Sequence, residues 1–139
     1  MSRILGIDYG DVRTGFAITD ELSIISQGLE TFISNGNDKL ILKRIEELLQ
    51  TYNISTIVVG NPINLDGSES DRSRKTKDFV HKIKSRFNNI NVEMIDERLT
   101  TVEAHRTMND LNIKGSKKKD LVDTISAEYI LESYIAKNK

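Results

Sequence analysis

The chain has 139 residues, a formal net charge of −1 and no cysteine. This length predicts one domain that buries its own core, and the lack of cysteine excludes disulfides, thiolate metal sites and a cysteine nucleophile. The near-neutral charge excludes a strong overall field for nucleic acid, so such a partner must be bound by local patches. No apolar stretch approaches membrane-spanning length, and residues 1–3 lead directly into a predicted strand. We therefore expect a cytoplasmic protein without a signal peptide.

The first half of the chain predicts three strands, a helix and a fourth strand. Strands are expected at residues 3–8, 14–19 and 23–32, with short turns typical of an antiparallel meander. Asp38 is a candidate cap for a helix that runs to about Tyr52. The β-branched run at residues 54–59 predicts a buried central strand. The apolar face of the helix comprises Ile41, Ile45, Leu48, Leu49 and Tyr52.

The second half alternates helices with one more strand. Residues 64–73 are polar and predict a mobile loop, followed by a helix that turns Phe79, Val80, Ile83 and Phe87 toward the core. Residues 91–96 predict a strand, and Thr100 or Thr101 opens a further helix that residues 112–119 interrupt. Asp120 is expected to cap a final helix to about Ala136. This order predicts an α/β fold with a mixed five-stranded sheet, three antiparallel strands and then parallel crossovers, flanked by helices.

Carboxylates follow two of the predicted strands and lie on the last helix. Asp8 ends the first strand, Glu97 follows the fifth, and Asp123 lies near the start of the final helix. Ligands of open α/β sheets collect at the carboxyl ends of the strands, so these three acids have a plausible meeting place. Oxygen ligands without cysteine favour Mg²⁺ or Mn²⁺, and two such ions could hold the attacking and leaving oxygens of a phosphodiester. The glycines around Asp8 would let a phosphate or metal approach the backbone.

Asp8, Asp123 and the neighbouring Asp96 also have structural interpretations, whereas Glu97 favours the catalytic one because glutamate is a poor turn former. Asp8 can be an ordinary turn residue, and Asp96, next to Glu97, can simply accept hydrogen bonds from Arg98. Asp123 can be a first-turn acid that complements the helix dipole.

Basic residues form two clusters. Arg72, Arg74 and Lys75 begin the first, and the second contains Lys117, Lys118 and Lys119. Taken alone, each cluster is more simply a solvated helix face or a charged loop. Together they are candidate contacts for a nucleic-acid backbone outside the catalytic site.

Sequence blocks along almost the whole chain resemble those of a known family, YqgF, also called RuvX. The blocks, in order, are Gly6-Ile7-Asp8-Tyr9-Gly10 with Arg13-Thr14-Gly15 and Ala17; Val58-Val59-Gly60-Asn61-Pro62; Asp66-Gly67; Asp96-Glu97-Arg98-Leu99-Thr100-Thr101 with Ala104; and Asp123 with Ala127, Ile130, Leu131 and Tyr134.

The resemblance implies a ribonuclease H-like fold over residues 1–139 and metal-dependent nuclease chemistry. By position, Asp8, Glu97 and Asp123 match the family's catalytic and metal-binding acids. Arg13 and Arg98 would contact phosphate, and Thr100 and Thr101 would position the strand end or bind the backbone. The implied function is processing of the 5′ end of pre-16S rRNA in ribosome biogenesis, with Mg²⁺ or Mn²⁺ in a two-metal site.

Three alternatives stay open. The same chemistry could resolve branched DNA, the Holliday junction, as RuvC-like dimers do, or the chain could be a noncatalytic RNA-binding factor of ribosome assembly. An ATPase of the actin and sugar-kinase superfamily is disfavoured, because it needs two related domains around its nucleotide. We expect a monomer or weak homodimer that binds no membrane.

Overall fold

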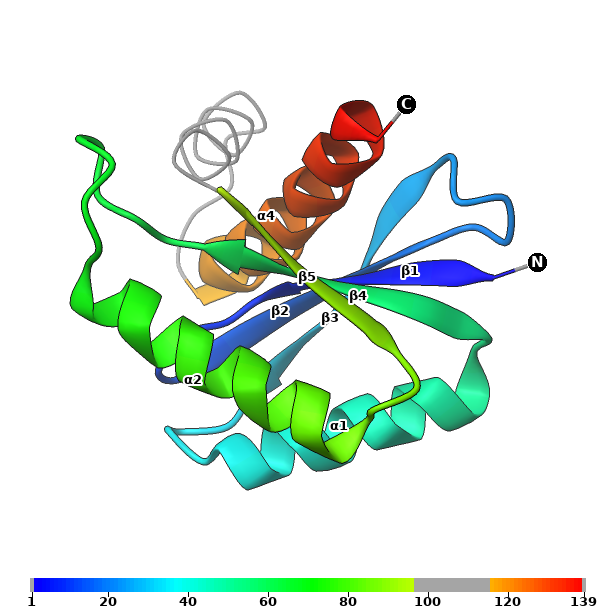
Figure 1. The fold of residues 1–139 in the computed structure, drawn as a ribbon, viewed down its shortest axis with the longest axis horizontal. Coiled ribbons are helices and arrows are strands. Elements are labelled where there is room, and N and C mark those ends of the chain that lie inside the picture. Colours follow the sequence, from blue (N-terminus) through cyan, green and yellow to red (C-terminus); the bar gives the residue numbers. More distant parts are fainter. Residues whose placement is uncertain (1, 97–115, 139) are drawn as a thin grey trace.

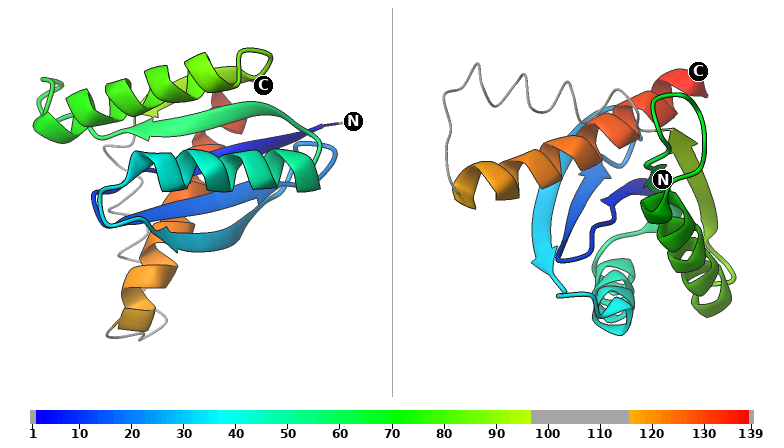
Figure 2. Two further views of the ribbon diagram at one scale, coloured as in Figure 1. Left: turned by 90° about the horizontal axis from the view of Figure 1, so that it is seen from below. Right: turned by 90° about the vertical axis from the view of Figure 1, so that its left-hand side faces the viewer.

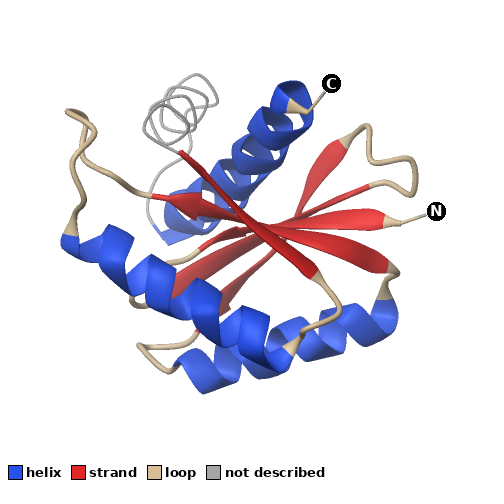
Figure 3. Ribbon diagram, in the orientation of Figure 1, coloured by secondary structure: helices blue, strands red, loops and turns tan. Residues whose placement is uncertain are grey.

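The computed structural model describes residues 2–96 and 116–138, with the backbone alone for residues 116–122. These ranges form a five-stranded sheet with helices on both faces (Figures 1 and 3). The elements are β1 (Arg3–Asp8), β2 (Arg13–Thr19), β3 (Ser26–Ile33), α1 (Asp38–Thr51), β4 (Ile54–Asn61), α2 (Asp71–Arg86), β5 (Asn91–Asp96) and α4 (Ser116–Lys137).

The sheet is mixed, as predicted, with the strand order β3-β2-β1-β4-β5. The pairs β1–β2 and β2–β3 are antiparallel, whereas β1–β4 and β4–β5 are parallel. The carboxyl ends of β1, β4 and β5 therefore lie at one edge of the sheet. Asp8 ends β1 at this edge, and Asp96, the last residue of β5, is in register with Asn61 of β4.

The two faces of the sheet have different cores. Helices α1 and α2 cover one face, and α4 crosses the other (Figure 2). On the α1/α2 face the large side chains of β1 and β2, such as Leu5, Ile7 and Phe16, are fully buried. On the α4 face the strands carry small residues, and Ala17 packs against Ala127 and Leu131 of α4. The helix can consequently lie close to the backbone of the sheet.

Several predicted boundaries are confirmed and others are wrong by a few residues. β1 and β5 have the predicted limits. β3 begins at Ser26 rather than at residue 23, because Ser23 has a positive φ and the Asp20 carboxylate accepts hydrogen bonds from the backbone of Ile24 and Ile25, which makes a turn there. Helix α1 is capped by Asn37 rather than Asp38, since the Asn37 side chain accepts a hydrogen bond from the Lys39 backbone.

The predicted loop after β4 is shorter than expected. Ser70 caps α2 by accepting a hydrogen bond from the backbone of Ser73 at 3.0 Å, so residues 71–73 are helical. Asp66 holds the remaining turn by accepting from the backbone of Ser68, and Gly67 has a φ of +90° that favours glycine. The mobility of this segment stays a prediction.

The last helix also begins earlier than predicted. Helix α4 starts at Ser116, so Asp120 lies inside it and does not cap it, and the basic run 117–119 is helical rather than a loop. The helix expected from Thr100 or Thr101 lies outside the described residues. Among the helices that are described, none combines the length and apolarity needed to cross a membrane.

Candidate active site

Asp8 lies at the carboxyl edge of the sheet, on the face that α4 covers. Side chains alternate along a strand, and Ile4 and Gly6, which share the parity of Asp8, both meet α4. Asp8 is half-buried, and its register partner on β2 is Gly15. A group that contacts Gly15 on this face therefore lies next to the strand position of Asp8.

Asp123 of α4 is that group. A Cβ atom placed on Gly15 would lie 2.2 Å from the backbone oxygen of Asp123 and 3.1 Å from its Cβ. The Asp123 side chain thus leaves the helix directly over the strand partner of Asp8, and its Oδ2 atom is buried. Asp123 thus lies over the strand partner of Asp8, although the two acids are 115 residues apart in the sequence.

The interpretation of Asp123 as a first-turn acid is wrong. Helix α4 begins at Ser116, which places Asp123 about two turns inside it. The favourable interaction of a carboxylate with the helix dipole falls off within the first turn, so it does not account for an acid at this position.

The glycines near Asp8 make room for protein atoms, whereas the approach of a phosphate or metal to them stays a prediction. A Cβ on Gly10 would lie 2.3 Å from the backbone oxygen of Arg13, so Gly10 permits the tight β1–β2 turn. Gly6 and Gly15 permit the close approach of α4. Glycines inside a strand are a known signal of close backbone approach, and this signal was present in the sequence.

The third predicted acid, Glu97, lies outside the described residues, as do Arg98, Thr100 and Thr101. Its neighbour Asp96 is exposed. The preceding residue, Ile95, packs on the α4 face against Val58 and Ile130, and consecutive residues of a strand point to opposite faces. Asp96 therefore belongs to the opposite face from Asp8. Within residues 2–96 and 116–138, no group of three or more acidic, histidine or cysteine side chains could hold a metal ion. Two carboxylates on one face are nevertheless the hard oxygen ligands that Mg²⁺ and Mn²⁺ prefer.

Tyr9, next to Asp8, anchors this strand end to the other layer. Its ring stacks on Phe79 of α2, with 4.3 Å between centroids and 8° between planes. Its hydroxyl donates a 2.6 Å hydrogen bond to Asp38 of α1, which also accepts from Lys82 at 2.9 Å. Burial and the Asp38 carboxylate raise the pKa of Tyr9 well above its usual range. Sequence reasoning missed this anchor, because the spacing of these residues does not predict their contact.

The predicted basic residues of α2 divide into two groups. Arg72 donates to the backbone oxygen of Tyr9, and Lys75 forms a 3.5 Å ion pair with Asp11 in the β1–β2 turn, so both lie beside the strand end that carries Asp8. Arg74 instead pairs with Asp71 and Glu69. A hydrogen bond from Lys77 holds the pKa of Glu69 below its usual value, so this acid stays charged beside Arg74.

The remaining predicted basic residues lie on the α4 side. Arg13 of β2 shares the parity of Gly15 and therefore the face of Asp8. Lys117, Lys118 and Lys119 occupy the first turn of α4, where only the backbone is described.

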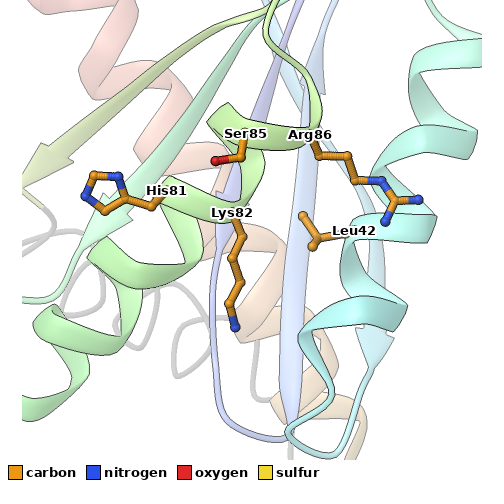
Figure 4. Close-up of a pocket in the computed structure, with 5 residues that line it drawn as sticks. All are labelled: Leu42, His81, Lys82, Ser85 and Arg86. Carbon is orange, nitrogen blue, oxygen red and sulfur yellow. The ribbon is translucent and has the colours of Figure 1, made fainter.

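A shallow pocket of about 400 Å³ lies where the C-terminal half of α2 faces α1 (Figure 4). His81, Lys82, Ser85 and Arg86 line it with Leu42. In Figure 4, Arg86 extends toward α1, whereas His81 points to the other side of α2. Lys82 pairs with Asp38 and Arg86 pairs with Glu46 at 2.9 Å, so the charges of its two permanent cations are already compensated. This pocket is a weaker candidate for a ligand than the edge at Asp8.

A family model described as "RuvX: Holliday junction resolvase" matches residues 2–137. The chain belongs to the RuvX family. Its relatives include proteins named "Putative pre-16S rRNA nuclease" from Ruminiclostridium cellulolyticum, 49% identical over 96% of this chain and 93% of the relative, and from Phocaeicola vulgatus, 43% identical over 100% and 99%.

Solved structures show the fold that the RuvX chain shares with other nucleases. RuvC of T. thermophilus bound to a Holliday junction substrate has a TM-score of 0.60 at 12% identity and covers 99% of this chain and 96% of its own. The fowlpox virus Holliday junction resolvase has a TM-score of 0.57 at 17% identity, with 99% of each chain covered. The fold is therefore ribonuclease H-like, as predicted.

Proposed function

We propose that this RuvX chain is a divalent-metal-dependent endonuclease that processes the precursor of 16S rRNA. The observation that carries the proposal is the close contact of Asp123 with Gly15, which is the strand partner of Asp8. Carboxylate oxygens are the hard ligands that Mg²⁺ and Mn²⁺ prefer, and the Asp123 carboxylate, with a buried Oδ2, lies over the strand partner of Asp8, which supports a metal role for this pair. The names of the relatives support the choice of substrate.

Asp8 and Asp123 would hold the metal, and Glu97 would complete the ligand set. On β5, residues with the parity of Glu93 and Ile95 meet α4, and Glu97 is the next residue of this parity. A bound Mg²⁺ or Mn²⁺ lowers the pKa of a water ligand and stabilises the charge that develops on the phosphate. The protein contributes the fixed position of its carboxylates, through the sheet edge and α4.

The substrate backbone would follow the surface beside this edge. Arg13 shares the face of Asp8, whereas Arg72 and Lys75 flank the β1–β2 turn from α2. Arg74, Arg98, Thr100, Thr101 and the lysines at 117–119 are proposed as further contacts. Residues 1–139 would act as one nuclease domain in the cytoplasm, where ribosomal precursors are made.

The test is cleavage of a 16S rRNA precursor by purified protein with Mn²⁺. Asp8→Asn, Glu97→Gln and Asp123→Asn should each reduce the rate by at least about a hundredfold, as expected for loss of a metal ligand. Asp96→Asn is the matched control, since Asp96 adjoins Glu97 but belongs to the other face, and it should retain activity. Full activity of Asp8→Asn would contradict the proposal.

A four-way DNA junction belongs in the same experiment, because the family description names a Holliday junction resolvase. We expect faster cleavage of the RNA precursor. Faster cleavage of the junction would keep the proposed chemistry and replace the substrate. Binding of RNA without cleavage, unchanged in Asp8→Asn, would indicate a noncatalytic assembly factor.

A further inference from the structure

Helix α4 crosses the sheet over three glycines, one from each of three adjacent strands. Gly6 of β1, Gly15 of β2 and Gly28 of β3 all have α4 atoms where a Cβ would be. Glycine inside a strand is destabilising relative to alanine, so its use at three contact points requires a reason. The close approach of the helix supplies that reason.

The three glycines do not have equivalent neighbours. A Cβ on Gly15 would meet the backbone oxygen and carbon of Asp123 at 2.2 and 2.6 Å. On Gly6 it would meet the Leu131 Cγ at 2.6 Å and the backbone oxygen of Ala127 at 3.0 Å, and on Gly28 the end of the flexible Glu128 side chain at 2.9 Å and the Thr124 Cβ at 3.1 Å. The helix backbone cannot rotate away as the end of a side chain can, and the backbone overlap at Gly15, 2.2 Å, is much deeper than the 3.0 Å contact at Gly6. Of the three, Gly15 thus constrains the helix itself most directly.

The size of the constraint matters for a metal site. Real Cβ atoms essentially never approach another heavy atom below 3.0 Å, whereas the Gly15 position offers 2.2 Å, so alanine would displace α4 or β2 by nearly 1 Å. Metal and catalytic constellations need their ligands within about 0.5 Å of the productive geometry. The displacement would fall between Asp123 and Asp8, the register partner of Gly15.

We infer that Gly15 is a positioning residue for the nuclease: its missing side chain sets the separation of the Asp8 and Asp123 carboxylates. This inference rests on the proposed function, and Gly15 itself touches neither metal nor substrate in it. Two contacts predict which of the other two glycines affects Asp123 more. Thr124, beside Gly28, is the next residue after Asp123, whereas Leu131, beside Gly6, lies about two turns further along α4.

The experiment compares Gly15→Ala, Gly28→Ala and Gly6→Ala by thermal unfolding and by calorimetric titration of Mn²⁺ without substrate. Steric overlap predicts the stability loss in the order Gly15, Gly6, Gly28. Proximity to Asp123 predicts the loss of Mn²⁺ affinity in a different order: Gly15, Gly28, Gly6. Gly15→Ala should weaken Mn²⁺ binding by about tenfold or more and raise the Mn²⁺ concentration for half-maximal cleavage accordingly.

The test stays decisive even if Gly15→Ala does not fold. Gly6→Ala should then lose more stability than Gly28→Ala, whereas Gly28→Ala should lose more Mn²⁺ affinity than Gly6→Ala. Affinity losses that follow the stability losses would overturn the inference, as would wild-type Mn²⁺ affinity in a folded Gly15→Ala. Asp123→Asn separates the two proposals. Wild-type Mn²⁺ binding by Asp123→Asn would reject the metal role itself, whereas its loss together with normal binding by Gly15→Ala would reject only the role of Gly15.

Discussion

Arg72 donates a 3.1 Å hydrogen bond to the backbone oxygen of Tyr9, the residue that follows Asp8. The contact joins the first turn of α2 to the strand end that carries a proposed metal ligand. It places a permanent positive charge beside the β1–β2 turn, where Lys75 and Asp11 also meet. Arg72 and Lys75 thus lie at the same edge of the sheet as Asp8.

The first prediction concerns Lys75. The Lys75–Asp11 pair is largely exposed, so it contributes little to stability, but Asp11 competes with phosphate for the lysine. Lys75→Ala should weaken RNA binding and lower the slope of log affinity against log salt by about 1. Asp11→Asn should tighten binding by about twofold, since it removes one repulsive charge from the phosphate path.

Lys84→Ala is the matched control for Lys75. Lys84 is an exposed lysine of α2 that lies nine residues further on, which places it on the opposite side of the helix. It should leave the salt slope unchanged in a fluorescence-anisotropy titration. Equal effects of the two lysine substitutions would show that only net charge matters, and not the position beside Asp8.

The second prediction concerns the Tyr9 anchor. Tyr9→Phe removes the hydrogen bond to the Asp38 carboxylate but keeps the ring stacked on Phe79. It should lower the free energy of unfolding by about 1–2 kcal/mol in chemical denaturation. Tyr9→Leu also loses the stacking and should cost about 1 kcal/mol more. If Tyr9→Phe is as stable as the wild type, the hydroxyl does not anchor the strand end.

The third prediction is a pH dependence of the α4–β5 contact. The Tyr134 hydroxyl donates a 2.6 Å hydrogen bond to Glu93, which lowers the pKa of Glu93 and raises that of Tyr134 to about 12. A carboxyl whose pKa is lowered by folding stabilises the fold fully above its ordinary pKa, and this contribution is lost as the pH falls through the lowered value. Tyr134→Phe should therefore cost about 1 kcal/mol at neutral pH, and less in acid.

Thermal unfolding of wild type and Tyr134→Phe across acidic and neutral pH measures this difference. Tyr134 remains protonated as a donor throughout, because its pKa is about 12. In a Glu93→Gln background the acceptor has no charge to lose, so the cost of Tyr134→Phe should no longer vary with pH. A cost that stays constant with pH in the native background would contradict the role of the Glu93 charge.

The local pattern of the chain was sufficient for most of the architecture. Strand limits at Arg3–Asp8 and Asn91–Asp96 follow from strand-forming segments that end in acids. The helical spacing in α1 predicted the buried Ile41, Ile45 and Leu48 but not the buried Leu42. The positions of Asp8 and Asp123 in family blocks were enough to select them as candidate metal ligands, a role that stays a prediction. These properties depend on neighbours in the sequence, which is why they can be predicted without coordinates.

Which segment approaches the strand glycines was decided only by the tertiary structure. The sequence shows Gly6, Gly15 and Gly28 without indicating that a helix about a hundred residues later crosses all three. The stack of Tyr9 on Phe79 and the hydrogen bond from Arg72 to Tyr9 are equally non-local. Such contacts depend on how α2 and α4 pack against the sheet, and packing sums many weak interactions between distant segments, which local spacing does not encode.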